Sequence, residues 1–302
     1  MDIENKLIEL TDVRKAYGTN VAVDGVTFNV RKGEVFGLLG PNGAGKSTTI
    51  SMMSGLFPPD TGTIRIGGTE DPTTPKTRQR IGLAPQALAI YERLTGDENL
   101  RFFAQIFGLA GKELEQRINW ALELSGLADR RKDPVEQYSG GMKRRLNIAC
   151  ALVHSPEIVF LDEPTVGVDP QSRNFIFESV EKLKSGGLTV VYTTHYMEEA
   201  ARLCDRVAIM DAGKILALDT VPILIDKYGG DSLLIADFAK PPLSLAHLGG
   251  EITDNSFRLQ SKDPFKDLAK IAESGNTMLS LRLERADLES VFLSLTGRTL
   301  RD

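Results

Sequence analysis

The sequence predicts an α/β fold built around a parallel sheet, and three patterns indicate this. Residues 36–58 and 155–225 alternate short apolar runs with helical segments, as parallel sheets with crossover helices do. Residues 91–150, between these two halves, read as helical, and a glycine-rich turn follows the first apolar run. We therefore expect a parallel core with a helical part between its two halves.

The flanking elements follow from local patterns. Residues 4–35 and 60–70 alternate apolar and polar side chains with turns at Lys32-Gly33 and Gly67-Gly68, which predicts a small antiparallel sheet. Thr95 and Glu98 have capping-box spacing and predict the start of a helix. In that helix an aromatic stripe of helical period predicts a core-facing side, and Trp120 is also expected in the core. The stripe comprises Phe102, Phe103, Ile106 and Phe107.

Residues 231–302 differ in character from the main domain, which we expect over residues 4–228. They contain strand-like pieces (SLLIADF, SFRLQ, TMLSLRL) and end in a helix with one apolar face and Gly297 just past it. This predicts a small C-terminal α/β domain. The apolar face comprises Leu288, Val291, Phe292 and Leu295.

Bulk properties favour a globular cytoplasmic protein. The chain is 41% hydrophobic and 25% charged, and its net charge of −5 disfavours a nucleic-acid partner. The longest apolar run, residues 148–153, is far shorter than the ~18 residues of a spanning helix. The opening MDIENKLIEL has no secretion signal. Cys150 and Cys204 lie in apolar settings, so we expect free thiols rather than a disulfide or metal pair.

Residues 39–49, LGPNGAGKSTT, match the pattern GxxxxGK[ST] between a predicted strand and a predicted helix. Such a loop surrounds phosphate oxygens with backbone N–H groups, aided by the helix dipole. Lys46 would contact the outer phosphates, and the Ser47 hydroxyl would bind Mg²⁺. A glycine-rich turn that binds nothing is the alternative. The predicted nucleotide-binding residues are Gly40, Pro41, Asn42, Gly43, Ala44, Gly45, Lys46, Ser47 and Thr48.

Two further apolar runs end in polar residues suited to hydrolysis. EIVFLDE at residues 157–163 predicts a buried parallel strand, with Asp162 holding Mg²⁺ and Glu163 acting as general base on water. The run at residues 188–192 leads to His195, which could contact the γ-phosphate. Alone, the acid pair could be surface charge and the histidine structural. His154 and His247 are expected to be structural.

Residues 138–145 read YSGGMKRR. Together with the glycine-rich loop at residues 39–49 and the LDE sequence, this segment resembles the ATP-binding-cassette (ABC) ATPases, whose signature is LSGGQ. The resemblance covers roughly residues 4–225. It implies a P-loop NTPase fold with a RecA-like parallel core, an antiparallel β subdomain and a helical subdomain at about 91–150. The C-terminal domain would be a small α/β appendage.

The resemblance also implies roles for individual residues. Tyr17 would stack on adenine, and Gln86 in GLAPQ would be the Q-loop glutamine that contacts the metal and the catalytic site. Asp169 would belong to the D-loop, and His195 would be the switch histidine. The implied catalytic set is Glu163, His195, Gln86 and Lys46, and the implied Mg²⁺ ligands are Ser47, Gln86 and Asp162. Tyr138 and Met142 depart from the usual Leu and Gln.

The signature segment is predicted to begin a helix capped by Ser139, so that the amides of Gly140 and Gly141 and the helix dipole form an anion site. A helix cap without a ligand is the alternative. The family implies that this site binds the γ-phosphate held by another copy. Two cassettes, as a homodimer or heterodimer, would then enclose two ATP molecules.

The ending DLESVFLSLTGR resembles ATPase subunits of bacterial ABC-2-type exporters, including the drug-exporting group. The implied function is ATP-driven export, of drugs or other hydrophobic cargo, by a separate permease at the inner face of the cell membrane. The stretch ALAIYERLT after Gln86 would receive a short permease helix, or would instead pack inward. Alternatives are an ABC factor acting on ribosomes or DNA, and a P-loop kinase. The single cassette and the net charge of −5 disfavour the ribosome or DNA factor, and the YSGGM segment disfavours the kinase.

Overall fold

The computed structural model describes residues 5–68, 70–242 and 245–297, and the chain divides into two compact units. Unit 1 runs from Met1 to Val221 and unit 2 from Pro222 to Asp302. This division lies a few residues before the expected one at 228–231. A Cβ on Gly229 would lie 3.0 Å from Cβ of Ala286, so the segment after α8 (Val221–Tyr228) packs within unit 2.

A six-stranded sheet forms the centre of unit 1, with the order β5-β6-β7-β3-β8-β9. All neighbours are parallel except β8 and β9. The sequence patterns did not include β5, which is one of the two edge strands. The strands are β3 (Val35–Leu39), β5 (Ile81–Ala84), β6 (Ile158–Asp162), β7 (Thr189–Thr194), β8 (Arg206–Asp211) and β9 (Lys214–Asp219).

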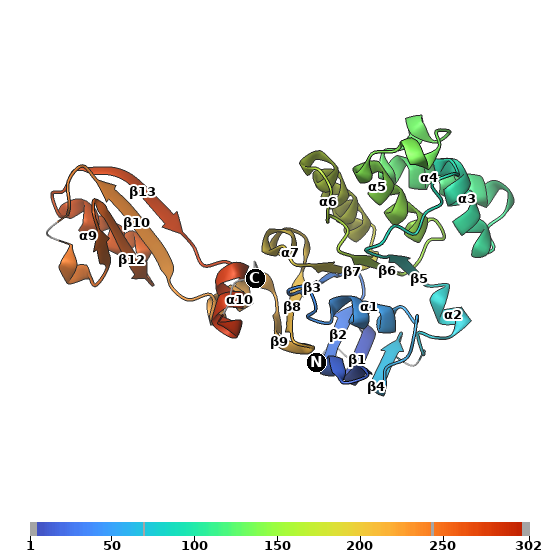
Figure 1. Ribbon diagram of the computed structural model, residues 1–302, viewed down its shortest axis with the longest axis horizontal. Coiled ribbons are helices and arrows are strands. Elements are labelled where there is room, and N and C mark those ends of the chain that lie inside the picture. The colour runs from blue at the N-terminus through green and yellow to red at the C-terminus, as the bar shows by residue number, and fades with distance from the viewer. Residues whose placement is uncertain (1–4, 69, 243–244, 298–302) are drawn as a thin grey trace. The chain divides into compact units, whose positions relative to one another are not determined.

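The central strands β3, β6 and β7 are buried along their whole length because both faces of the sheet are covered. On one face, Phe160 of β6 joins a core shared with α1 (Lys46–Met53) and the antiparallel sheet. On the other face, Val159 and Leu161 pack with α5 (Gly140–Leu152), α6 (Pro170–Ser185) and α7 (Met197–Leu203). Figure 1 shows α5, α6 and α7 on one side of this sheet, and α1 with the antiparallel strands on the other.

The predicted antiparallel sheet has three strands in the order β2-β1-β4. They are β1 (Lys6–Tyr17), β2 (Asn20–Arg31) and β4 (Thr61–Ile66), and the short helix α2 (Pro75–Arg78) follows.

The helical part contains α3 (Gly96–Ile106), α4 (Gly111–Ser125) and α5, with 3₁₀ turns η1 (Ala128–Arg130) and η2 (Val135–Gln137) between α4 and α5. The capping box is present: Thr95 accepts from the Glu98 amide, and Glu98 accepts from the Thr95 amide.

The prediction that the aromatic stripe is core was wrong for half of its members. Phe102 is 38% exposed and Ile106 is 62% exposed, because Leu100 and Ala104 form the buried side of α3. Phe103, Phe107 and Trp120 are half-buried.

Unit 2 contains a four-stranded antiparallel sheet in the order β11-β12-β10-β13. Its core includes Phe238, Phe257 and Ile271, the last from α9, a helix absent from the sequence patterns. The elements are β10 (Ser232–Phe238), η3 (Ala246–Leu248), β11 (Glu251–Thr253), β12 (Ser256–Ser261), α9 (Pro264–Glu273), β13 (Met278–Glu284) and α10 (Leu288–Thr296). As predicted, α10 buries Leu288, Val291 and Phe292, and Gly297 ends it in the left-handed region.

Both cysteines are free thiols. Cys150 is buried and Cys204 is half-buried, and desolvation raises the pKa of each thiol well above its usual range. In the part of the chain that the structure describes, every helix is too short or too polar to cross a bilayer.

Candidate functional site

The glycine-rich loop links β3 to α1 at the carboxyl edge of the parallel sheet, where ligands of such folds collect. Two glycines are required by close backbone approaches. A Cβ on Gly40 would lie 2.1 Å from the Met210 carbonyl oxygen, and one on Gly45 would lie 2.3 Å from that of Ala22. Gly45 also has a φ of 103°, which a larger residue adopts only with strain. The loop is therefore fixed by its surroundings.

A cleft of about 610 Å³ lies beside this loop. It is lined by predicted residues and by four that the motifs did not include, Asn20, Val21, Ala22 and Ala212. The predicted residues that line it are Tyr17, Asn42, Gly43, Gly45, Lys46, Ser47, Thr48, Gln86 and Glu163.

Three predicted residues from distant parts of the sequence converge on Glu163. Lys46 Nζ lies 3.1 Å from Oε1 of Glu163, and Gln86 Nε2 donates to Oε2 at 3.1 Å. His195 Nδ1 lies 3.5 Å from the same Oε2 and has no hydrogen-bond partner among the described residues. Lys46 also donates to the carbonyls of Gly40 and Pro41 at 2.8 and 3.0 Å. Lys46 thus contacts both the glycine-rich loop and the Glu163 carboxylate.

Glu163 follows β6 with a φ of 46°, in the left-handed region that non-glycine residues rarely adopt. Such a conformation costs on the order of 1–3 kcal/mol and is found mostly at functional sites. The Glu163 amide donates to Thr193 Oγ1 at 2.8 Å, and the Thr193 hydroxyl donates to Asp162 Oδ1 at 2.6 Å. One β7 hydroxyl therefore orients both acidic residues. The motifs did not include Thr193.

A buried network supports the segment that carries His195. The hydroxyls of Thr165, Tyr192 and Thr194 donate to the Glu199 carboxylate at 2.7, 3.0 and 2.9 Å. Burial, followed by the Glu199 charge, raises the pKa of Tyr192 well above its ordinary value. These contacts tie the end of β7 to α7, on either side of His195. Glu199 was also absent from the predicted set, because none of the sequence motifs includes it.

Mg²⁺ was expected to bind Ser47, Gln86 and Asp162. Ser47 and Gln86 line the cleft, and Asp162 ends β6 beside Glu163. Hydroxyl, amide and carboxylate oxygens are the donors that Mg²⁺ prefers, so the donor set fits this ion.

The predicted signature residues begin α5 and do not line the cleft of their own chain. Ser139 is the N-cap, and its Oγ accepts from the Met142 amide at 3.2 Å. Gly141 is buried against α6, because a Cβ there would lie 2.1 Å from Ser172 Oγ. Asp169 caps α6, and the hydrogen bond from the Ser172 amide lowers the pKa of Asp169. The signature and D-loop segments are thus neighbours.

The departure at Tyr138 has a structural reason. The ring is buried, its hydroxyl donates to the Arg130 carbonyl at 2.7 Å, and a Cβ on Gly96 would meet that hydroxyl at 2.5 Å. Tyr138 therefore packs the signature segment against the start of α3.

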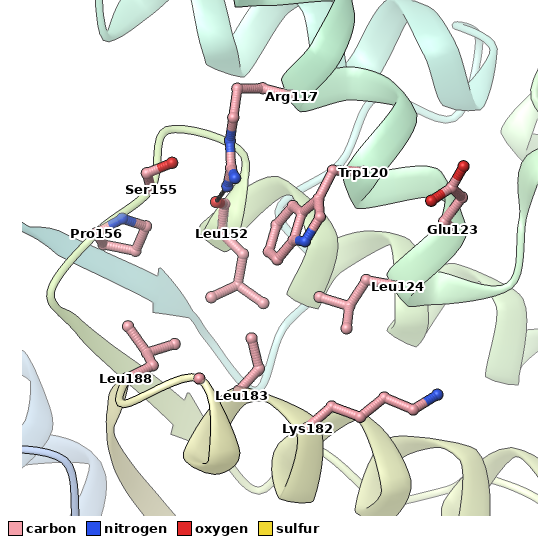
Figure 2. Close-up of a pocket in the computed structure, with 11 residues that line it drawn as sticks. Arg117, Trp120, Glu123, Leu124, Leu152, Ser155, Pro156, Lys182, Leu183 and Leu188 are labelled. Atoms are coloured by element: carbon pink, nitrogen blue, oxygen red, sulfur yellow. Dashed lines mark hydrogen bonds between the residues drawn. The ribbon is translucent and has the colours of Figure 1, made fainter.

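A second cleft, of about 480 Å³, lies between α4, the end of α5 and α6. Trp120, Leu124, Leu183 and Leu188 line it, and Arg117 stacks on Trp120 (Figure 2). None of the predicted site residues borders this cleft.

Comparison with known proteins agrees with this fold. A profile of the ABC transporter family matches residues 23–166. The chain is 45% identical to the linearmycin resistance ATP-binding protein LnrL of Bacillus subtilis (strain 168), over 98% of this chain and all of that protein. It is 41% identical to the Nod factor export ATP-binding protein I of Sinorhizobium fredii, over 98% of this chain and 87% of that protein.

Solved structures give the same result. An ATP-binding subunit of an ABC transporter superposes with a TM-score of 0.67 and 33% identity, over 74% of this chain and 93% of the other. The ATP-binding cassette MJ0796, solved as a dimer in a post-hydrolysis state with ADP and Pi, gives 0.66 and 27%, over 71% and 98%. The predicted P-loop ABC fold is confirmed. The chain belongs to the ABC transporter family, as an ATP-binding subunit with ATPase activity.

Proposed function

We propose that this protein powers export through a separate transmembrane permease by closing and reopening a dimer around ATP. The observation that carries the proposal is the convergence of Lys46, Gln86 and His195 on Glu163. Both relatives named above are ATP-binding proteins, one of linearmycin resistance and one of Nod factor export. Drugs or other hydrophobic molecules are therefore the proposed cargo.

Each group has a role in the proposed reaction. The loop amides and Lys46 hold the phosphates, and Tyr17, exposed at the cleft, stacks on the adenine. Ser47, Gln86 and Asp162 would hold Mg²⁺, which would supply positive charge beside the transferred phosphoryl group. When phosphates attract Lys46, the Glu163 carboxylate becomes free to accept a proton from the attacking water. His195, beside it, contacts the γ-phosphate.

The proposed dimer supplies the part that one chain lacks. The N-terminal end of α5 presents amides and a positive dipole to an anion, and this end does not border its own cleft. A second copy in head-to-tail orientation would place Ser139, Gly140 and Gly141 on the γ-phosphate, with Asp169 near the same water. Whether the second cassette is identical or related does not alter this geometry.

The proposed permease contact is a surface that we call the docking surface, formed by Leu56, Tyr91, Phe102, Phe103 and Phe107. Tyr91 is 50% exposed, and its ring centroid lies 5.0 Å from that of Phe102 and 6.3 Å from that of Phe103. Phe103, Phe107 and Leu56 line an adjoining groove of about 240 Å³. An exposed apolar surface of this kind marks an interaction site. It would hold the protein at the inner face of the membrane through an ABC-2-type permease.

The test is the substitution Glu163→Gln, which keeps shape and removes the base. We expect ATP binding to persist and kcat to fall at least about 100-fold, the range of general-base catalysis. Size-exclusion chromatography should show a dimer only with saturating ATP. Glu157→Gln is the matched control, since Glu157 precedes the same strand but pairs with Arg80 outside the site. A Glu163→Gln chain that stays monomeric with ATP bound would contradict the dimer mechanism.

A further inference from the structure

The loop that carries Gln86 is bound to α5 by the side chain of Arg144, a residue to which no role has been assigned above. Arg144 lies on α5 and is only 7% exposed. Its Nη1 donates to the carbonyl oxygen of Gln86 at 2.7 Å and to that of Pro85 at 3.3 Å. Asn147, three residues further along α5, also donates to the Pro85 carbonyl at 3.2 Å. The backbone of Gln86 is therefore held by the signature helix.

Arg144 is charged and partly desolvated. Desolvation lowers the pKa of Arg144, and the charges of Asp162 and Glu163 oppose that shift. A buried cation is costly unless its environment compensates it. Here the compensation comes from two backbone carbonyls and from the acidic pair at the end of β6.

We propose that Arg144 is a positioning residue: it anchors the Gln86 backbone to α5, so that the Gln86 amide stays directed at Glu163. The bond between Gln86 and Glu163 is 3.1 Å, and a side chain keeps such a contact only when its own backbone is fixed. Arg144 does not border the nucleotide cleft, so it acts through Gln86 rather than on ATP.

The same contact links the Gln86 loop to the helix that begins with the signature segment Ser139–Gly141. The consequence for the dimer rests on the proposed function. Arg144 is five residues after Ser139, within one rigid helix. Gln86 senses the nucleotide of its own chain, while Ser139–Gly141 serve the nucleotide of the other chain. Arg144 therefore makes the position of the signature depend on the occupied state of its own cleft.

A double-mutant cycle on the full chain tests the positioning role. Arg144→Met removes the guanidinium and keeps similar length, and we expect kcat to fall about tenfold while KM for ATP changes less than about twofold. In a Gln86→Ala background the same substitution should change kcat less than about twofold, because two residues that act as a unit are not additive. Additive losses would overturn the proposal. Arg144→Lys keeps a hydrogen-bond donor and the charge but loses the planar guanidinium. Its kcat should lie between those of Arg144→Met and the wild type.

Arg117→Met is the matched control. Arg117 also donates to two backbone carbonyls, those of Val153 and Leu152 at 2.9 and 2.8 Å, but these lie at the far end of α5 (Figure 2). We expect it to leave kcat per folded molecule unchanged, with thermal unfolding used to correct for folded fraction. If the wild-type chain hydrolyses ATP and Arg144→Met matches it, the positioning role fails while the proposed function stands.

The coupling is tested by dimer formation in the Glu163→Gln background. Adding Arg144→Met should raise the ATP concentration needed for half-maximal dimer several-fold, whereas adding Arg117→Met should not. An unchanged concentration would overturn the coupling. A Glu163→Gln chain that never dimerises would instead contradict the proposed function, so the two failures are distinct.

Discussion

His154 shows how one half-buried side chain makes the stability of this protein depend on pH. Its ring stacks on Phe107 with 3.6 Å between centroids, and Nε2 lies 3.0 Å from the Ile81 carbonyl oxygen. Nδ1 is buried and has no hydrogen-bond partner among the described residues. Desolvation lowers the pKa of His154 to about 4, from 6.5 for the free side chain. The folded protein therefore holds this ring neutral.

We predict that the free energy of unfolding decreases as the pH falls from 6.5 to about 4. In this window the unfolded state binds a proton that the folded state rejects, and above 6.5 the contribution is constant. With a discount for partial exposure, the loss is about 1–2 kcal/mol. Urea unfolding of wild type and His154→Gln at pH 7.5 and 4.5 measures it. Equal pH dependence in the two proteins would contradict the prediction.

At the residue scale, local motifs predicted most of the residues that line the cleft but not the residues that support them. Gly45, Lys46 and Ser47 are recognisable because phosphate binding imposes a short, fixed spacing. Thr193 and Arg144 act through contacts with residues 30 and 58 positions away, and no spacing rule covers such pairs. Hydroxyls and arginines are also common everywhere in proteins. Only the packing of β6 against β7, and of α5 against the Gln86 loop, gives these residues their roles.

At the element scale, periodicity identified the helices but not which face of α3 is covered. Leu100 and Ala104 lie one turn apart and face the helical core, while Phe102 and Ile106 lie one turn apart on another side. Both pairs satisfy the helical period equally well. The sequence therefore predicted α3 correctly and its exposed apolar face incorrectly. The continuous apolar runs of β6 and β7 carry no such ambiguity, because both faces are buried.

We predict that charge on the exposed side of α3 weakens membrane association without affecting hydrolysis. The double substitution Phe102→Glu and Ile106→Glu places two carboxylates on or next to the docking surface, at positions too exposed to disturb the core. The amount of chain recovered with washed membranes should fall about tenfold, or about 1.4 kcal/mol. Leu279→Glu, at an exposed position of β13, is the control. Unchanged recovery with the α3 variant would exclude this surface as the permease contact.

At the scale of the whole molecule, every residue that lines the nucleotide cleft belongs to unit 1. Unit 2 has its own sheet and its own core around Phe238 and Phe257. The sequence indicated two domains because the strand and helix patterns change after residue 230. It did not place the boundary correctly with respect to α8, since a short helix between domains reads the same whichever unit it packs on.

We predict that a chain truncated after Val221 still folds and binds ATP. Its affinity for a fluorescent ATP analogue should lie within about threefold of the full-length value, or about 0.7 kcal/mol. Calorimetry should show that the truncated chain keeps a cooperative unfolding transition. Loss of nucleotide binding in a chain that still unfolds cooperatively would mean that unit 2 contributes to the cleft.

The two thiols have a practical consequence. Because only the thiolate attacks maleimides, and burial raises the pKa of both Cys150 and Cys204, neither reacts readily at neutral pH. A single cysteine introduced on the surface, for example in place of Lys112 on α4, could then carry a spin or dye label without removal of the native pair. Distances between labels on two chains would report each opening and closing of the proposed ATP-bound dimer directly.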